Sequence, residues 1–491
     1  MSARRPNVIL VLADQWRPDA LSVYGHPEVR TPHLDALAAE GVAFRNVVTQ
    51  SPLCVPARSC FFTGRYVHQT GIADNGAHLW PESPNFVRAV RDAGYETLQR
   101  GKLHLFWRHD NELPMSDHLL QRFGFCDAVE TTGKCSEGRL RASAYTEHLR
   151  RQGMLAEFFR DLWKRTRSRP NAVSYGPSIL RDDDDHIDAW ILERGREAIR
   201  SRKPDDAPYF LWLGPPGPHD PFDPPNAWAR MYAPETLSAG LRRFSTDPAS
   251  RQRAERLRVR ESGDDEIRRL RALYYGNVSF IDHKIGQLVA DLRAAGQYDD
   301  TWLIVTADHG EMLGDFHLTT KSVFHRAADQ VPLVIKTPRG LAGAPRGKLS
   351  DALVELIDVA TTIREIAGGA LDGDQGRSLL PLLRGETPLN AHREDAHSQV
   401  DGRCMVRTRE CKLLFTNWEA PEPTCFYDLE QDPQELNNVL AERPAEVRAF
   451  IERHVRPFYE RTQERLGAPW VDARPFKAWG RYVLGELFDE A

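Results

Sequence analysis

Three short apolar segments, each followed by polar side chains, constrain the fold of this chain more than any other feature. Each segment is continuously apolar rather than alternating, which is typical of strands buried on both faces in a parallel sheet. The segments are Val8–Leu12, Tyr209–Leu213 and Thr301–Thr306, followed by Asp14-Gln15, His219-Asp220 and Asp308-His309. Because the carboxyl ends of parallel strands meet at one edge of a sheet, we expect these polar residues to converge on one pocket.

Helical patterns alternate with these segments, so we predict an α/β fold with a large, mostly parallel central sheet flanked by helices. Thr31-Pro32 predicts the start of a short helix and Gly41 its end. Further helical patterns cover 143–168, 186–202 and 264–296, the last interrupted at Gly276 and Gly286, and an arginine-rich solvated stretch covers 241–271.

The 491 residues exceed what one hydrophobic core usually organises, and the composition changes near residue 385. We therefore predict two domains, a larger α/β domain over 1–385 and a small α+β domain over 386–491. Strand patterns cover 403–416 and 426–429, and a helical pattern covers 441–465. The segment 468–491 is rich in aromatic residues, which usually dock on the chain's own core or on a neighbouring subunit, so we expect a homo-oligomer.

Charge and hydropathy exclude several classes of partner. Lys and Arg number 65 against 70 for Asp and Glu, a net charge of -5, so no basic excess indicates nucleic-acid binding. No apolar run is long enough to span a bilayer, and the run at Val8–Ala13 is shorter than a signal-peptide core. We expect no membrane association and a cytoplasmic protein. The seven cysteines form no CxxC pair, so neither a disulfide framework nor a zinc knuckle is indicated.

The most informative motif is Ser51-Pro52-Leu53-Cys54-Val55-Pro56-Ala57-Arg58. Pro56 favours the first turn of a helix, which places Cys54 at the helix N-terminus, where the helix dipole stabilises an anionic group. Arg58 follows four residues later on the same helix face and can hold that group. Taken alone, a single cysteine is more often a small buried residue beside a structural arginine.

The surrounding motifs change that balance. The pattern C-x-P-x-R followed by Thr63-Gly64-Arg65 resembles the signature of the type I, formylglycine-dependent sulfatases of the alkaline phosphatase superfamily. The resemblance covers most of the chain, in the family's order: Asn7–Leu10, Thr31–Asp35, Gly101–His104, Thr306–Gly310, Val331–Leu333 and Phe426–Asn438. The pairs Asp14-Gln15 and Asp308-His309 look more like the choline-sulfatase and phosphonate monoester hydrolase branch, and His325-Arg326 replaces the family's Tyr-Glu.

The resemblance implies one divalent metal ion, held by Asp14, Gln15, Asp308 and His309 together with the group at position 54. Carboxylate and amide oxygens suit hard cations such as Ca²⁺, Mg²⁺ and Mn²⁺. The histidine moves the balance toward Mn²⁺, Ca²⁺ remains open, and Mg²⁺ is less favoured.

The resemblance also implies that a formylglycine-generating enzyme converts Cys54 to an aldehyde, whose hydrate attacks the sulfur of the substrate. Arg58 stabilises the attacking oxygen, Lys102 holds a sulfuryl oxygen and His104 takes a proton from the second hydroxyl. Lys102 and His104 are two residues apart, so on an extended segment they face the same way. His219 and Lys321 match the family's leaving-group side, and Asn75 matches a ligand of a substrate oxygen. As isolated residues, the lysines and histidines are ordinary surface groups, and Asn75-Gly76 is a common turn.

The expected activity is hydrolysis of a small organic sulfate ester to an alcohol and inorganic sulfate. A phosphonate monoester or a phosphodiester also presents a singly charged tetrahedral group, so a hydrolase of those substrates with the same site is the first alternative. A catalytically silent binding protein on the same fold is an alternative from another class.

Overall fold

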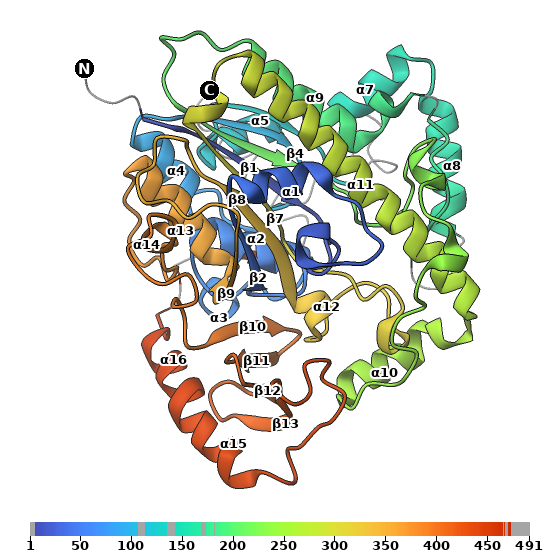
Figure 1. The fold of residues 1–491 in the computed structure, drawn as a ribbon, viewed down its shortest axis with the longest axis vertical. Coiled ribbons are helices and arrows are strands. Elements are labelled where there is room, and N and C mark those ends of the chain that lie inside the picture. The colour runs from blue at the N-terminus through green and yellow to red at the C-terminus, as the bar shows by residue number, and fades with distance from the viewer. Residues whose placement is uncertain are drawn as a thin grey trace.

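The computed structural model describes residues 5–106, 113–134, 143–167, 173–180, 182–464, 466 and 470–472. Its centre is an eight-stranded sheet with the order β5-β4-β6-β1-β7-β8-β2-β9 (Figure 1). Only β8 runs antiparallel to its neighbours. The strands are β1 (Asn7–Ala13), β2 (Gly41–Val48), β4 (Glu96–Gly101), β5 (Asp127–Glu130), β6 (Tyr209–Gly214), β7 (Thr301–Ala307), β8 (Gln330–Lys336) and β9 (Lys348–Glu355).

Two groups of helices flank this sheet (Figure 1). One group is α1 (Pro32–Ala39), α9 (Ile187–Arg200) and α11 (Asp264–Ala294), and the other is α2 (Cys54–Thr63), α4 (Phe86–Asp92) and α13 (Leu356–Ala367). Every residue of β1, β6, β7 and β8 is buried. This burial on both faces explains why the strands appear in the sequence as continuous apolar runs. The predicted fold class is therefore confirmed.

A second, antiparallel sheet lies at the C-terminal end of the molecule, with the order β10-β11-β12-β13 (Figure 1). Its strands are β10 (Ala396–Val400), β11 (Arg403–Arg407), β12 (Cys411–Thr416) and β13 (Glu422–Asp428), and α15 (Pro444–Phe450) and α16 (Arg456–Arg461) pack beside them. The short strands β3 (Ala77–Leu79) and β14 (Trp470–Asp472) form a two-stranded sheet. The domain division at residue 385 stays a prediction, and the aromatic tail beyond residue 472 lies outside the described residues.

The remaining helices are shorter or peripheral. They are α3 (Val67–Thr70), α5 (Leu113–Arg122), α7 (Ala144–Arg151), α8 (Leu155–Arg167), α10 (Pro248–Leu257), α12 (Arg326–Asp329) and α14 (Leu380–Leu383), and a π-helical turn (Ile451–Val455) joins α15 to α16. Among the described residues, no helix combines the length and apolarity that crossing a bilayer requires.

The structure corrects several predicted helix bounds. The pattern over 143–168 forms two helices, α7 and α8, and the arginine-rich stretch is helical only from residue 248. The first helix ends at Ala39, so Gly41 begins β2 rather than capping the helix. Helix α11 continues through Gly276 and Gly286, because these glycines permit close packing: an added Cβ would lie 2.5 Å from the Trp228 carbonyl oxygen at Gly276, and 2.4 Å from the His33 ring at Gly286.

Candidate active site

The two predicted metal-binding pairs lie side by side because they follow neighbouring parallel strands. Strands β1 and β7 pair in register, with Ala13 opposite Ala307, so Asp14 and Asp308 emerge together at the carboxyl edge of the sheet. The backbone N–H of Gln15 donates to Oδ1 of Asp308 across 3.1 Å. Asp14, Gln15, Asp308 and His309 are all fully buried.

Helix α2 brings the motif cysteine to this edge. Cys54 is the first residue of the helix, and its Sγ lies 3.1 Å from Nε2 of His309 and 3.9 Å from Oδ1 of Asp14. Arg58, one turn later, donates from Nε to Oδ2 of Asp308 across 2.7 Å, and its Nη2 lies 3.8 Å from Oδ2 of Asp14. The sequence therefore placed Cys54 and Arg58 correctly on one helix face.

Four of these side chains form a cluster that suits a metal ion. Asp14, Cys54, Asp308 and His309 each offer one ligand atom, and these atoms all lie within 4.8 Å of one another. Two carboxylate oxygens and an imidazole nitrogen fit a divalent cation that prefers oxygen with some nitrogen. Gln15 lies against the same cluster, where its side-chain oxygen accepts a hydrogen bond from Nζ of Lys321.

Basic side chains surround the carboxylates and the thiol. Lys102 donates to Oδ2 of Asp14. Burial acts to raise the pKa of Asp14, but the charges of Lys102, His219 and Lys321 outweigh it and hold that pKa well below its usual range. Burial likewise opposes ionisation of Cys54, yet Lys321, His309 and Lys102 lower the pKa of its thiol. The field of the site therefore favours an anionic group at position 54.

His104 lies beside Cys54, but not on an extended segment as predicted. Its φ is 57°, in the left-handed region, and its backbone N–H donates to Oε1 of Glu130 across 3.4 Å. Burial, with the nearby charge of Lys102, lowers the pKa of His104 to about 4, so the imidazole is neutral near pH 7. Its Nδ1 is buried without a hydrogen-bond partner among the described residues.

The two remaining predicted residues lie at the edges of the site. Asn75 accepts a hydrogen bond at Oδ1 from the backbone N–H of Val55 across 3.0 Å, so it lies against the first turn of α2. Nδ1 of His219 lies 2.7 Å from the backbone oxygen of Asp220. His219 is among the basic groups that lower the pKa of Asp14, which places His219 within electrostatic range of the cluster. All eleven predicted residues thus occupy one region, while their roles stay predictions.

Several supporting residues escaped sequence reasoning. Glu311 is fully buried and accepts hydrogen bonds from the Gln15 amide and from the backbone N–H groups of Leu313 and Thr320. Burial raises the pKa of Glu311. Glu311 directly follows the Asp308-His309-Gly310 motif, and this position in the sequence could have identified it as a residue of the site. By contrast, no motif marks Glu130 or Thr49, whose Oγ1 donates to the backbone oxygen of Asp308 across 2.6 Å.

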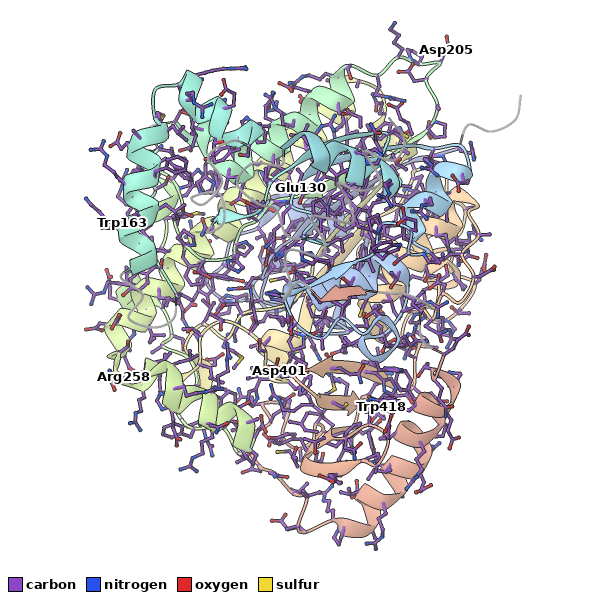
Figure 2. All side chains as sticks on the ribbon, turned by 180° about the vertical axis from the view of Figure 1, so that it is seen from behind. Glu130, Trp163, Asp205, Arg258, Asp401 and Trp418 are labelled. Carbon is purple, nitrogen blue, oxygen red and sulfur yellow. The ribbon has the colours of Figure 1, made fainter. Side chains whose placement is uncertain are left out.

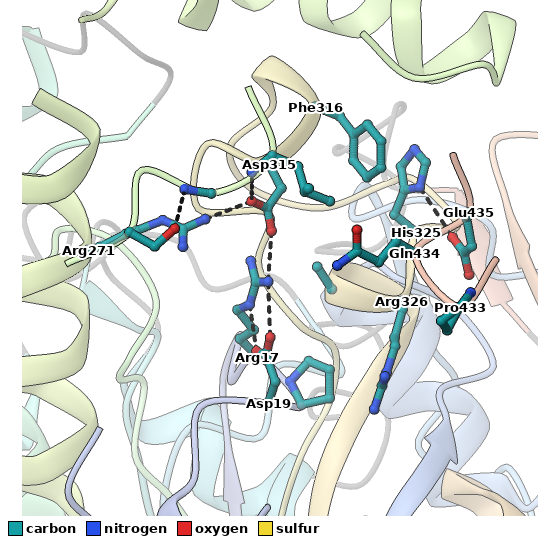
Figure 3. Close-up of a pocket in the computed structure, with 15 residues that line it drawn as sticks. Arg17, Asp19, Arg271, Asp315, Phe316, His325, Arg326, Pro433, Gln434 and Glu435 are labelled. Carbon is teal, nitrogen blue, oxygen red and sulfur yellow. Dashed lines mark hydrogen bonds and ion pairs between the residues drawn. The ribbon is translucent and has the colours of Figure 1, made fainter. Parts of the chain in front are cut away.

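A separate cavity of about 360 Å³ lies behind the loops that follow β1 and β7 (Figure 3). Its main charged groups neutralise one another: Nη2 of Arg17 and Nη2 of Arg271 each lie 2.7 Å from an oxygen of Asp315. His325, from the dipeptide that departs from the family pattern, stacks on Phe316 with ring centroids 4.2 Å apart. These contacts surround the loop that follows Asp308-His309.

The mostly parallel sheet flanked by helices, with a cluster suited to a metal ion at the carboxyl ends of its strands, is the architecture of the alkaline phosphatase superfamily. The chain belongs to the sulfatase family, whose model matches residues 6–370. A model described as N-sulphoglucosamine sulphohydrolase, C-terminal, matches residues 314–458. The predicted family and the predicted enzyme class, a sulfuric ester hydrolase, are confirmed.

Three relatives illustrate the similarity. The multifunctional alkaline phosphatase superfamily protein PehA of Trinickia caryophylli is 30% identical over 491 residues, which cover 90% of this chain and 92% of the relative. The choline-sulfatase of Rhizobium meliloti is 27% identical over 462 residues, covering 90% and 84%. The structure of a phosphonate monoester hydrolase from Silicibacter pomeroyi matches with a TM-score of 0.74 and 26% identity, covering 94% of this chain and 96% of that one.

Proposed function

We propose that this protein hydrolyses a small organic sulfate ester to an alcohol and inorganic sulfate, with a formylglycine made from Cys54 and one divalent metal ion. The observation that carries the proposal is the convergence of Asp14, Cys54, Asp308 and His309, whose ligand atoms lie within 4.8 Å of one another. The Sγ atom of Cys54 stands in for the oxygen that the modified residue would present. A formylglycine-generating enzyme is therefore an expected partner.

The donor set fits Ca²⁺ or Mn²⁺, with Mg²⁺ less favoured. Asp14, Asp308 and His309 would hold the ion, and Gln15 would join them by turning its side-chain oxygen away from Lys321. When bound, such an ion supplies positive charge that favours a deprotonated hydroxyl and polarises the sulfuryl group.

The chain's own residues supply the remaining functions. Arg58 lies one turn from position 54 and fixes the Asp308 carboxylate. Lys102 and Lys321 reach the same cluster from distant parts of the sequence and can compensate the charge of a sulfuryl group. His104 is neutral near pH 7 and its side chain lies within hydrogen-bond reach of position 54, so it can accept a proton from a group there. His219 and Lys321 are proposed to bind and protonate the bridging oxygen, and Asn75 a substrate oxygen.

A phosphonate monoester or phosphodiester hydrolase is the second candidate. The likeness to a solved phosphonate monoester hydrolase over 94% of this chain favours it. The same residues would serve, because both substrate classes present a singly charged tetrahedral group.

A paired measurement separates these candidates. The protein, co-expressed with a formylglycine-generating enzyme and loaded with metal, is assayed for kcat/KM on matched aryl sulfate and aryl phosphonate monoesters. Cys54→Ala is the control, and mass spectrometry of the peptide that holds Cys54 reports the aldehyde. We expect sulfate preference that the control abolishes. A phosphonate preference would establish the second candidate, and no turnover of either ester with the aldehyde present would favour a silent binding protein.

The assembly and the compartment are part of the same proposal. We expect a homo-oligomer in the cytoplasm that acts without a nucleic-acid or membrane partner. Light scattering on the purified chain tests the oligomeric state, and a single-subunit mass would overturn it.

A further inference from the structure

The arginine-rich stretch over 241–271 places a guanidinium group beside the loop that carries Lys321. Within it, α10 packs against the turn at Asp315–His317, and Figure 1 shows α10 beside this part of the chain. From α10, Arg253 donates from Nη2 to Oγ1 of Thr320 across 3.0 Å. Thr320 directly precedes Lys321, so this guanidinium lies against the loop that carries a proposed substrate-binding lysine.

A second guanidinium reaches the other flank of Lys321 from the C-terminal sheet. Arg403, the first residue of β11, donates from Nη2 to the backbone oxygen of Ser322 across 2.8 Å. The N–H of Ser322 in turn donates to the oxygen of Pro52, two residues before Cys54. Arg253 and Arg403 come from segments distant in the sequence, yet they bracket the same catalytic loop.

Around the loop that carries Lys321, nearby carboxylates do not fully neutralise the charges of Arg253 and Arg403. Within the described residues, Arg253 has no carboxylate at ion-pair distance, and its buried Nε has no hydrogen-bond partner. The carboxylate nearest to Arg403 is Asp401, at 3.7 Å, which lies at the turn before β11 (Figure 2). Burial lowers the pKa of Arg253, and the charges of Arg256 and Arg403 lower it further against a partial offset from Asp401 and Glu311. Because a guanidinium remains protonated, such a group of like charges is stabilised by an added anion.

We propose that Arg253 and Arg403 bind a second anionic group on the alcohol half of the substrate. The substrate class is then a sulfate ester whose alcohol carries a carboxylate or a further sulfate. Guanidinium groups bind such planar or tetrahedral oxyanions through paired, charge-assisted hydrogen bonds. The inference rests on the proposed function, in which Lys321 lies on the leaving-group side, because the two residues that the arginines contact, Thr320 and Ser322, flank that lysine.

The kinetic test compares two aryl sulfates of matched leaving-group acidity, one with a carboxylate on the ring and one neutral. Arg253→Met and Arg403→Met remove the charge and keep most of the apolar stem. We expect Arg253→Met to lose about 10–100-fold in kcat/KM on the carboxylated ester and to retain the neutral ester within about twofold. Arg403→Met also removes a hydrogen bond to the loop backbone, so it should lower kcat/KM on both esters, but more on the carboxylated one. Arg253→Lys should recover part of the loss. The matched control is Arg258→Met, which removes an exposed arginine of the same stretch that pairs with Glu261 at 2.6 Å.

A binding test separates this inference from the proposed function. Calorimetry measures the affinity of Cys54→Ala protein for both esters, so no turnover is required. Tighter binding of the carboxylated ester, lost in Arg253→Met, supports the inference even if catalysis fails. Equal affinity for the two esters overturns it. Equal losses on both esters in the kinetic test also overturn it, because they would show a merely structural role. Failure of the wild-type protein to hydrolyse either ester refutes the proposed function alone.

Discussion

The hydroxyl of Tyr274 contacts the loop that carries Asp14 and Gln15, the first pair proposed to bind metal. Tyr274 lies in the middle of α11 and donates from its hydroxyl to the backbone oxygen of Gln15 across 2.8 Å. The same hydroxyl accepts a hydrogen bond from the backbone N–H of Arg17 across 2.7 Å. Gln15 has a φ of 65°, so the chain leaves the strand geometry of β1 here and depends on this bridge.

We expect Tyr274→Phe to destabilise the fold and to weaken metal binding. The ring would still pack against Phe222, at a centroid distance of 5.2 Å, but two buried backbone groups would lose their partner. Each unpaired group costs about 1–2 kcal/mol, so the free energy of unfolding should fall by about 2–4 kcal/mol. Loosening a residue beside the metal ligands should also weaken metal affinity by about tenfold.

Tyr275→Phe is the matched control for this experiment. Tyr275 is the next residue on α11 and is 1% exposed, but the described part of the chain gives its hydroxyl no hydrogen bond. Urea unfolding of both variants measures the stability difference, and a metal titration measures affinity. If the two variants were equally stable and bound metal equally, the Tyr274 hydroxyl would not support the loop.

Three further changes test other parts of the structure. Lys412→Met should lower the free energy of unfolding by about 3–5 kcal/mol in denaturant titrations, because it leaves the buried carboxylates of Asp329 and Glu435 without their cation. The control is Lys348→Met, at an exposed lysine, and an equal effect of both changes would contradict the reasoning. Glu130→Leu should lower kcat about tenfold, because the backbone N–H of His104 loses the carboxylate oxygen that accepts its hydrogen bond. Glu130→Gln keeps an accepting oxygen, so equal kcat values for the two variants would refute a positioning role of Glu130. Protein in the presence of metal at about 100 times its Kd is the reference for the last change. Removal of the metal by a chelator should lower the free energy of unfolding by about 2.7 kcal/mol from that reference. An unchanged urea midpoint would show that the cluster holds no ion.

The sequence predicted the central strands because their burial leaves an unambiguous apolar pattern. The predicted runs correspond to β1, β6 and β7, which lie next to one another in the sheet. The reversed direction of β8 leaves no such signal, since an apolar run does not encode strand direction. The glycines of α11 suggested that the helix is interrupted, because glycine has a low intrinsic helix propensity. In the structure, the missing side chains instead allow neighbouring residues to pack closely against the helix.

Some residues of the candidate site could be predicted from local motifs, whereas others are identified only by their tertiary contacts. Asp14, Cys54 and Asp308 follow recognisable motifs, so their proximity could be expected from strand order and helix start. Tyr274 and Arg253 lie on helices with no motif, and only the folded chain shows that they touch the catalytic loops. Local sequence patterns therefore identify residues of the candidate site, while the residues that position them become evident only in the three-dimensional structure.

The loop between β7 and β8 connects the C-terminal sheet to the candidate site. Several non-glycine residues of this loop have positive φ values, a conformation that persists only where surrounding contacts enforce it: Leu313, Phe316, His317, Thr320 and Ser322. The C-terminal sheet supplies two of those contacts, since Lys412 donates to the backbone oxygen of Phe324 and Arg403 to that of Ser322. Removing the chain beyond residue 385 would free the loop to relax and would displace Lys321 from Gln15. The C-terminal sheet thus contacts the loop that carries Lys321, while the division of the chain at residue 385 stays a prediction.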